Sequence, residues 1–235
     1  GANVFIQSGA GSTTGSGKPG LGNLIVGYNE QESADLDSAY HNIIVGTKHS
    51  FSGHSSIVTG TQNDILADYV AVLGGTKNIV DEDNTGILGG DNNEVSAKGA
   101  VIVGGSSNTA SGQYSVVAGG DSNLVSATDG AIFGGKDNTV ETQTGTILGG
   151  DGNTASGNTS TVVGGDGNEA AGTKAIVLGG SGNAADGSNT TAIGGTTLTV
   201  TGANGVAMGG NLADVSGNYA VIVGGNDNET NNQYQ

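Results

Sequence analysis

The stretch that decides the fold is residues 149–163, GGDGNTASGNTSTVV, because its outline returns along most of the chain. Numbered from its first glycine, this repeat begins with a Gly-Gly pair, and such pairs recur with a strict 15-residue period from Gly74 to Gly224. A fixed short period predicts a solenoid, since so small a unit cannot enclose a core alone and must stack on its neighbours. We therefore expect an all-β solenoid, a parallel β-roll in which each repeat makes one coil.

Two positions of the repeat are apolar in every coil and are never aromatic. Position seven runs from Ile65 to Val215, and position fourteen runs from Val72 to Ile222. These columns predict two short strands per coil whose side chains meet inside a thin roll, so that stacked coils form two narrow parallel sheets. The strict period argues against a disordered low-complexity chain, although 47 of the 235 residues are glycine.

Two further positions indicate how the corners of the roll are built. Position two is glycine from Gly60 onward, which predicts a positive φ or a close approach that a Cβ would block. Position five is asparagine except at Leu198 and Ala213. Asparagines stacked about 4.8 Å apart can form an amide ladder that satisfies polar groups and fixes the register. The predicted ladder residues are Asn63, Asn78, Asn93, Asn108, Asn123, Asn138, Asn153, Asn168, Asn183 and Asn228.

Position fifteen carries large apolar residues in nearly every coil. Neighbours in a strand point to opposite faces, so position fifteen points outward if position fourteen points inward. An unbroken outward stripe of apolar residues is typical of an association surface. Burying it between chains would add the buried apolar area that so thin a roll lacks on its own. We predict a cyclic homo-oligomer; the alternative is a monomer whose glycine corner turns this column inward. The predicted interface residues are Leu73, Leu88, Val103, Phe133, Leu148, Val163, Leu178, Ile193, Met208 and Val223.

The repeat resembles a known family. Residues 103–112, VGGSSNTASG, and the Ala-Ser-Gly motif at residues 155–157 are similar to head repeats of trimeric autotransporter adhesins of the YadA type. The resemblance covers about residues 60–235 and implies a left-handed parallel β-roll that forms a homotrimer along its length on a bacterial or phage surface. Two features depart from the family: the chain has a 15-residue period where a 14-residue period is usual, and the sequence shows no heptad stalk or membrane anchor.

The two ends of the chain depart from the 15-residue period. We expect residues 1–20 to be an N-terminal arm or cap, residues 21–58 irregular first coils with an acidic insert, residues 59–225 the regular roll, and residues 226–235 a polar C-terminal cap or tail. The irregular coils begin at Val26, Val45 and Thr59, each followed by glycine, so that a 19-residue spacing is followed by a 14-residue spacing. The acidic segment from Glu30 to Asp37 is expected to loop out of the roll.

The charge of the chain excludes some partners. It has 22 acidic residues, six lysines and no arginine, for a net charge of −16, which predicts no binding to nucleic acid or to an anionic membrane. No run is long enough for a membrane-spanning helix. The absence of cysteine fits an exported protein, and we expect an extracellular or cell-surface location, bacterial or phage.

Sites for chemistry are few. Asp151 and Asp166 share position three of consecutive coils, where calcium bridging is the functional hypothesis and a solvated acidic edge the alternative. Such a pair also has the separation of a retaining glycosidase, but an active site needs a concave pocket that the sequence does not indicate. His41, His49 and His54 cluster in the early coils, where a metal site is a further alternative. We expect no enzymatic activity and no cofactor other than calcium.

Together these patterns predict a non-catalytic extracellular structural or adhesive protein, a rod-like β-roll surface fibre or adhesin head with an unknown ligand on a host surface or matrix. One alternative is a self-assembling filament subunit joined end to end by strand addition; another is a segment of a phage tail fibre. Ice or polysaccharide binding through Thr146, Thr161 and Thr191 at position thirteen is disfavoured because apolar residues interrupt that column.

Overall fold

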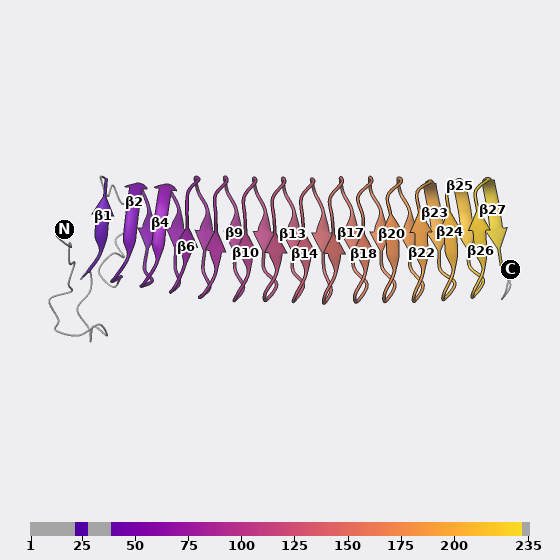
Figure 1. Cartoon of the computed structure of the whole chain (residues 1–235), viewed down its shortest axis with the longest axis horizontal. Helices are drawn as coiled ribbons and strands as arrows, with labels where there is room; N and C mark the ends of the chain where they lie inside the picture. The colour runs from indigo at the N-terminus through magenta and orange to yellow at the C-terminus, as the bar shows by residue number, and fades with distance from the viewer. Residues whose placement is uncertain (1–21, 28–38, 232–235) are drawn as a thin grey trace, which may run out of the picture.

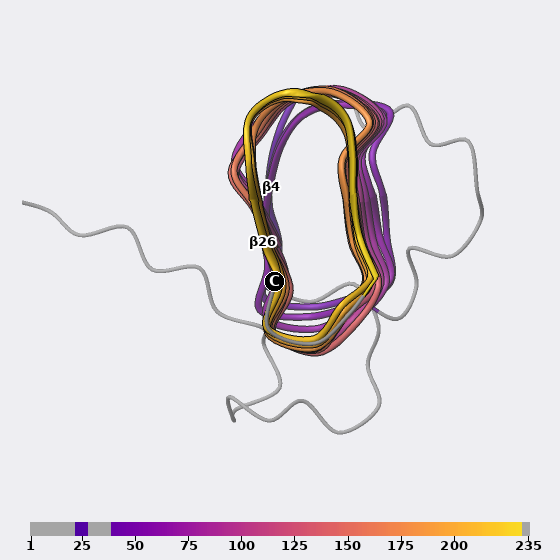
Figure 2. The same ribbon diagram turned by 90° about the vertical axis from the view of Figure 1, so that its right-hand side faces the viewer.

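The computed structural model describes residues 22–27 and 39–231, which form an all-β solenoid without a helix. The coils stack side by side into a rod (Figure 1), and the view along the rod shows each coil as a flattened ring (Figure 2). Two parallel sheets form the long sides of the ring, one of 14 strands and one of 13. The predicted parallel β-solenoid of 15-residue coils is confirmed.

The strands are short because each crosses only one side of the ring. The larger sheet, called the even sheet, contains β1 (Leu24–Val26), β2 (Ile43–Thr47), β4 (Ile57–Thr61), β6 (Ala71–Val72), β8 (Gly86–Ile87), β10 (Val101–Ile102), β12 (Val116–Val117), β14 (Ala131–Ile132), β16 (Thr146–Ile147), β18 (Thr161–Val162), β20 (Ile176–Leu178), β22 (Thr191–Ile193), β24 (Val206–Met208) and β26 (Val221–Val223). The other sheet, called the odd sheet, contains β3 (Ser50–Phe51), β5 (Asp64–Ile65), β7 (Ile79–Val80), β9 (Glu94–Val95), β11 (Thr109–Ala110), β13 (Leu124–Val125), β15 (Thr139–Val140), β17 (Thr154–Ala155), β19 (Glu169–Ala170), β21 (Ala184–Ala185), β23 (Thr196–Val200), β25 (Asn211–Val215) and β27 (Asn226–Thr230).

The extra residue of the regular repeat sits at one corner. Strands β2 and β4 pair in a single register along their whole length, from Ile43 with Ile57 to Thr47 with Thr61. Strands β4 and β6 keep the same offset as far as Val58 with Val72, but the next bridge joins Thr61 to Thr76, which is one residue further along the chain. The register therefore changes within residues 73–75, where the even strand is interrupted, and all later coils repeat this insertion.

The core is formed by positions seven and fourteen, as expected. Every residue of these two columns from Ile65 to Val215 is fully buried. Alternate residues of a strand point to opposite sides of the sheet, so inward residues such as Val125 and Ile132 fill the space between the sheets. The columns hold only Val, Ile and Ala, which keeps the roll thin.

Three positions in each coil have a left-handed backbone. At position two, Gly105 has φ +92, and a Cβ there would overlap the carbonyl oxygen of Gly120 in the next coil; positive φ and close approach, offered as alternatives, both hold. Positions four and eleven have φ near +57 in most coils without being glycine, as at Ser122 and Tyr114. The backbone N–H of Tyr114 donates to the carbonyl of Lys98 in the preceding coil (3.0 Å). Sequence reasoning missed both positions because their residue types vary.

The predicted ends are only partly described. The N-terminal arm and the acidic insert lie outside the described residues. Strand β1 pairs with β2 through Val26 and Val45, so a single coil absorbs the long spacing between these two residues. Residues 226–230, expected in a cap or tail, continue the odd sheet as β27. Within the described ranges no helix is long and apolar enough to cross a membrane.

Candidate functional site

The outer face of the even sheet carries the apolar column of position fifteen. Most of its residues are exposed, from 37% for Met208 to 70% for Val223, and Ile193 is half-buried. These side chains point away from the buried position fourteen, as alternation along a strand requires. The inward orientation of this column, offered as part of the monomer alternative, is therefore wrong, whereas the number of chains stays a prediction.

Position thirteen adds a second outward column to the same sheet. It holds only Val, Ile, Ala, Gly and Thr, and Val116, Ile176 and Val221 are exposed. We call the two columns together, from Ala71 to Val223, the apolar face. None of its residues is charged, although the chain has 22 acidic residues and six lysines. Sequence reasoning missed the width of this surface because it considered position thirteen only as an interrupted threonine array.

The outer face of the odd sheet is mixed: it exposes Leu66, Ile79 and Leu124, but unlike the apolar face it also carries charged residues. Position six exposes Glu94, Glu169 and Asp214, and position eight exposes Asp81 and Glu141. Burying this face in an interface would remove water from carboxylates that have no partners, which costs free energy. The rod therefore has one side that can pack against another surface and one side that must remain solvated.

The glycines of position one border the apolar face. A Cβ placed on Gly74, Gly89 or Gly104 would meet no atom within 4 Å, and the φ of these residues lies outside the left-handed region. In this half of the rod the fold does not require glycine at position one. Its use there keeps the border of the face free of side chains, which allows another backbone to approach closely.

The position-five asparagines lie buried in one column along a corner, from Asn63 to Asn183. Asn123 shows the geometry: its Nδ2 donates to the carbonyl oxygens of Gly119 (3.1 Å) and Gly135 (3.0 Å). Its Oδ1 accepts from the backbone N–H of Asn138 (3.1 Å), and its Nδ2 also lies 3.1 Å from Oδ1 of Asn108. From Asn78 to Asn153 each amide thus joins its own coil to both neighbours and bonds polar groups of the corner.

The amide column changes character at both ends. At the N-terminal end His49 takes position five, where its Nδ1 accepts from the Asn63 N–H (3.3 Å); its place three residues after Gly46, like that of Asn63 after Gly60, was the signal that could have placed it there. At the other end the N–H of Leu198 donates to Oδ1 of Asn183 (2.9 Å), and its buried apolar side chain ends the amide contacts. Asn228 stands apart, exposed and bonded to the carbonyl of Gly224 (3.0 Å).

Removing one amide from the column should destabilise the rod. We expect Asn123→Ala to cost about 1 to 3 kcal/mol of unfolding free energy, because the buried N–H of Asn138 loses its acceptor and the corner carbonyls of Gly119 and Gly135 each lose one donor. Asn228→Ala is the matched control, and its cost should stay below about 0.5 kcal/mol because that residue is exposed. Urea unfolding of the two variants measures the difference, and equal midpoints would contradict a stabilising role for the column.

His49 should make stability depend on pH. Burial lowers the pKa of His49 below its usual value of about 6.5. Between the lowered pKa and about 6.5 the unfolded chain binds more protons, so stability falls as the pH drops through this window. His49→Asn, which restores the usual residue of position five, should flatten the dependence, whereas His41→Asn should preserve it. Thermal midpoints at about pH 5 and about pH 7.5 test this; a dependence unchanged by His49→Asn would refute it.

The acidic pair proposed for calcium lies side by side. Asp151 and Asp166 are paired across one parallel bridge, and both are exposed. Lys136 is the bridge neighbour of Asp151 on the other side, with its Nζ 3.5 Å from a carboxylate oxygen of Asp137. Within the described part of the chain, no three His, Asp or Glu residues gather as ligands for a metal ion. Calcium binding by this pair stays a prediction.

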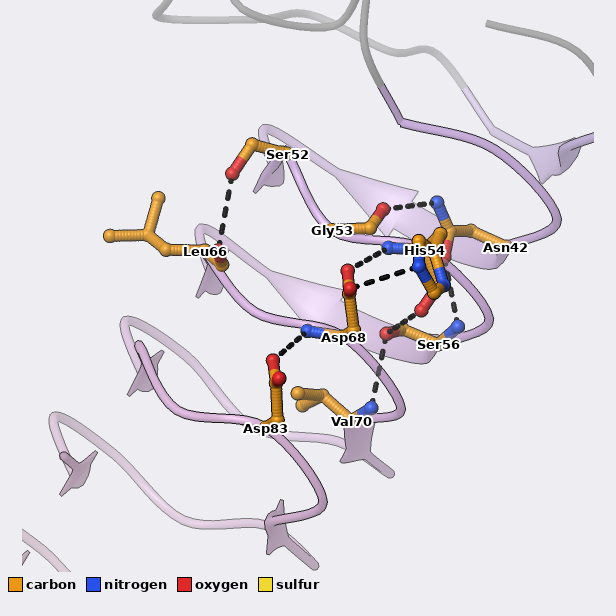
Figure 3. Close-up of polar contacts among 9 residues, drawn as sticks. All are labelled: Asn42, Ser52, Gly53, His54, Ser56, Leu66, Asp68, Val70 and Asp83. Carbon is orange, nitrogen blue, oxygen red and sulfur yellow. Dashed lines mark hydrogen bonds and ion pairs between the residues drawn. The ribbon is translucent and has the colours of Figure 1, made fainter. Parts of the chain in front are cut away.

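The three early histidines have separate environments. Figure 3 shows His54 bound to Asp68, with its Nε2 2.9 Å from the carboxylate. The ring of His54 stacks on Tyr40, with ring centres 4.7 Å apart, and meets Tyr69 edge-on at 5.1 Å. His49 instead belongs to the corner column. The structure therefore does not bring the histidines together as a metal site.

Comparison with protein-family models gives no match, and comparison with curated proteins gives none either. The likeness to adhesin head repeats consequently rests on the repeat of this chain alone.

Proposed function

We propose that the chain is a non-catalytic extracellular structural or adhesive protein, a rod-like β-roll that serves as a surface fibre or adhesin head. The observation that carries this proposal is the apolar face, which follows the even sheet without a charged residue. The apolar face covers the 11 strands from β6 to β26, so at a strand spacing of about 4.8 Å it is roughly 50 Å long. A continuous exposed apolar surface of this length is typical of a surface that binds a partner.

We propose further copies of the same chain as that partner. Each copy has a net charge of −16, but the charged side chains lie off the apolar face, so copies can meet there without burying carboxylates. The resemblance to YadA-type heads supports three copies around a common axis and a left-handed roll. A closed ring of three hides every apolar face and ends the association.

In this assembly the odd sheet and the turns face outward and meet the ligand on a host surface or matrix. The acidic exterior disfavours nucleic acid and anionic membranes, and a sequence without cysteine suits an extracellular location. A phage tail-fibre segment would use the same trimeric rod. A filament subunit would instead add strands end to end, which predicts a mass that grows with concentration.

Single-cysteine variants test the proposed contact, because the natural chain has no cysteine. Leu148→Cys places a thiol in the middle of the apolar face, where equivalent residues of three chains surround the axis. A short bis-maleimide reagent should therefore link the chains of this variant. Thr139→Cys, on the outer face of the odd sheet, is the control and should remain a single chain. Equal linkage in both variants, or none in Leu148→Cys, would contradict the interface.

A further inference from the structure

The turn that carries positions ten and eleven is rich in aromatic residues. It holds all the tyrosines of the described segments and two of the three histidines, on five different coils of the rod. These residues are Tyr40, His41, His54, Tyr69, Tyr114 and Tyr219.

The fold does not need tyrosine on this turn. Tyr69, Tyr114 and Tyr219 occupy position eleven with φ between +57 and +60, a conformation that costs a bulky residue about 1 to 2 kcal/mol. Other coils place residues as different as Gly99 and Lys174 there. The three tyrosines are nevertheless 54–55% exposed. The left-handed backbone belongs to every coil, but an exposed aromatic ring at this position is not required by the fold and points to function.

A network of polar contacts surrounds His54 (Figure 3). One oxygen of Asp68 accepts from the backbone N–H of His54 (2.8 Å), and the other lies 2.9 Å from Nε2 of its ring. The backbone N–H of Asp68 in turn donates to Oδ1 of Asp83 (2.8 Å) in the next coil. Two carboxylates are thus held in fixed orientations on adjacent coils, beside the aromatic rings.

The aromatic rings of the cluster hold one another in place. His54 lies stacked on Tyr40 at an interplanar angle of 26° and meets Tyr69 at 86°. Tyr69 is therefore positioned by its neighbour while more than half of it faces solvent. The Nδ1 of His54 is buried and has no hydrogen-bond partner among the described residues, so the contacts available to a ligand are those of the exposed Tyr69 ring and of the two carboxylates.

We propose that Tyr40, His54, Asp68, Tyr69 and Asp83 form a binding site for a neutral saccharide. The apolar C–H face of a sugar ring would pack on the exposed ring of Tyr69. Its hydroxyl groups would donate to the carboxylates of Asp68 and Asp83, as charge-assisted hydrogen bonds. This proposal rests on the proposed adhesive function, and it names the class of ligand that the rod would bind.

The charge and rigidity of the site favour a neutral sugar over other ligands. A net charge of −16 repels an anionic glycan. A basic peptide would be attracted by that charge, but mainly through long-range forces that salt screens. Carboxylates fixed by hydrogen bonds to His54 and Asp68 instead suit directional hydroxyl donors. Binding should accordingly change little as salt is added.

An array of neutral oligosaccharides built from glucose, galactose, mannose and N-acetylglucosamine provides the test, followed by titration calorimetry with the strongest binder. Tyr69→Ala and Asp83→Asn should each weaken binding at least about tenfold. Tyr114→Ala is the matched control, since Tyr114 has the same position and exposure, but its neighbour at position ten is Gln113 rather than an aspartate. This control should bind as tightly as the natural chain.

Three results would overturn the site: no neutral oligosaccharide binds, Tyr114→Ala loses binding as much as Tyr69→Ala, or a lysine-rich peptide binds where the sugars do not. Unchanged circular dichroism and thermal midpoints show that the variants are folded. Because the cluster lies within one chain, saccharide binding can be measured even if the chains do not assemble as proposed. Loss of sugar binding with an unchanged oligomer mass would conversely overturn only the saccharide site.

Discussion

Gly105→Ala is expected to destabilise the rod by about 3 kcal/mol or more. Gly105 has φ +92, and an added Cβ would overlap the carbonyl oxygen of Gly120 and lie 2.6 Å from Nδ2 of Asn108. Both obstacles belong to rigid parts of the corner, a backbone carbonyl and a buried amide, so neither can move without breaking hydrogen bonds between coils. For a chain of this length the thermal midpoint should fall by roughly 6 to 12 °C.

The neighbouring residue provides the matched control. An added Cβ at Gly104 would meet no atom within 4 Å, and its φ lies outside the left-handed region. Gly104→Ala should therefore be neutral or slightly stabilising, because alanine restricts the unfolded chain more than glycine does. Thermal unfolding of the two variants under identical conditions checks the contrast. A midpoint that falls equally in both, or in neither, would refute this account of the corner.

Leu148→Glu should separate the proposed assembly into single chains. Leu148 is exposed on the apolar face of one chain, so the substitution leaves the core of that chain intact. In the assembly each copy would bring an unpaired carboxylate into a dry interface, at a cost of about 3 kcal/mol per chain, which weakens association more than a hundredfold. The mass in solution is the measurement, and circular dichroism verifies that the roll remains folded.

Thr139→Glu adds the same charge on the other side of the rod. Thr139 lies at position six of β15, in a column that already contains Glu94 and Glu169. The odd sheet accepts such charges because it is solvated, so this variant should keep the mass of the natural chain. Dissociation of Thr139→Glu, or an unchanged mass for Leu148→Glu, would show that net charge rather than the apolar face governs assembly.

The fold could be predicted from the sequence because each coil repeats the same few requirements. The glycine of position two, the buried residues around Val125 and Ile132, and the asparagines beside them recur at a strict period, and each has a direct physical meaning. Stacking then converts a column in the sequence into a line of contacts in space. The outward direction of position fifteen followed from alternation along the strand and agrees with its exposure.

Features that depend on a change of register or on varied residues were not predicted. The insertion at residues 73–75 becomes visible only when the pairing of Thr61 with Thr76 is known. The left-handed backbone at Tyr114 was missed because position eleven has no constant residue type. His49 stands three residues after Gly46, where later coils have asparagine, but it was not assigned to the column because its residue type differs. The cluster around His54 depends on contacts between coils that periodicity does not specify.

The most direct test of the central claim is the absolute mass of the natural chain, measured by light scattering on a sizing column with and without a calcium chelator. The account predicts a stable species of three chains, since the apolar face spans the even sheet and a closed ring hides it. Loss of this three-chain species on chelation would show that calcium also stabilises the assembly, with Asp151 and Asp166 as its proposed ligands. A monodisperse single chain under both conditions would contradict the claim.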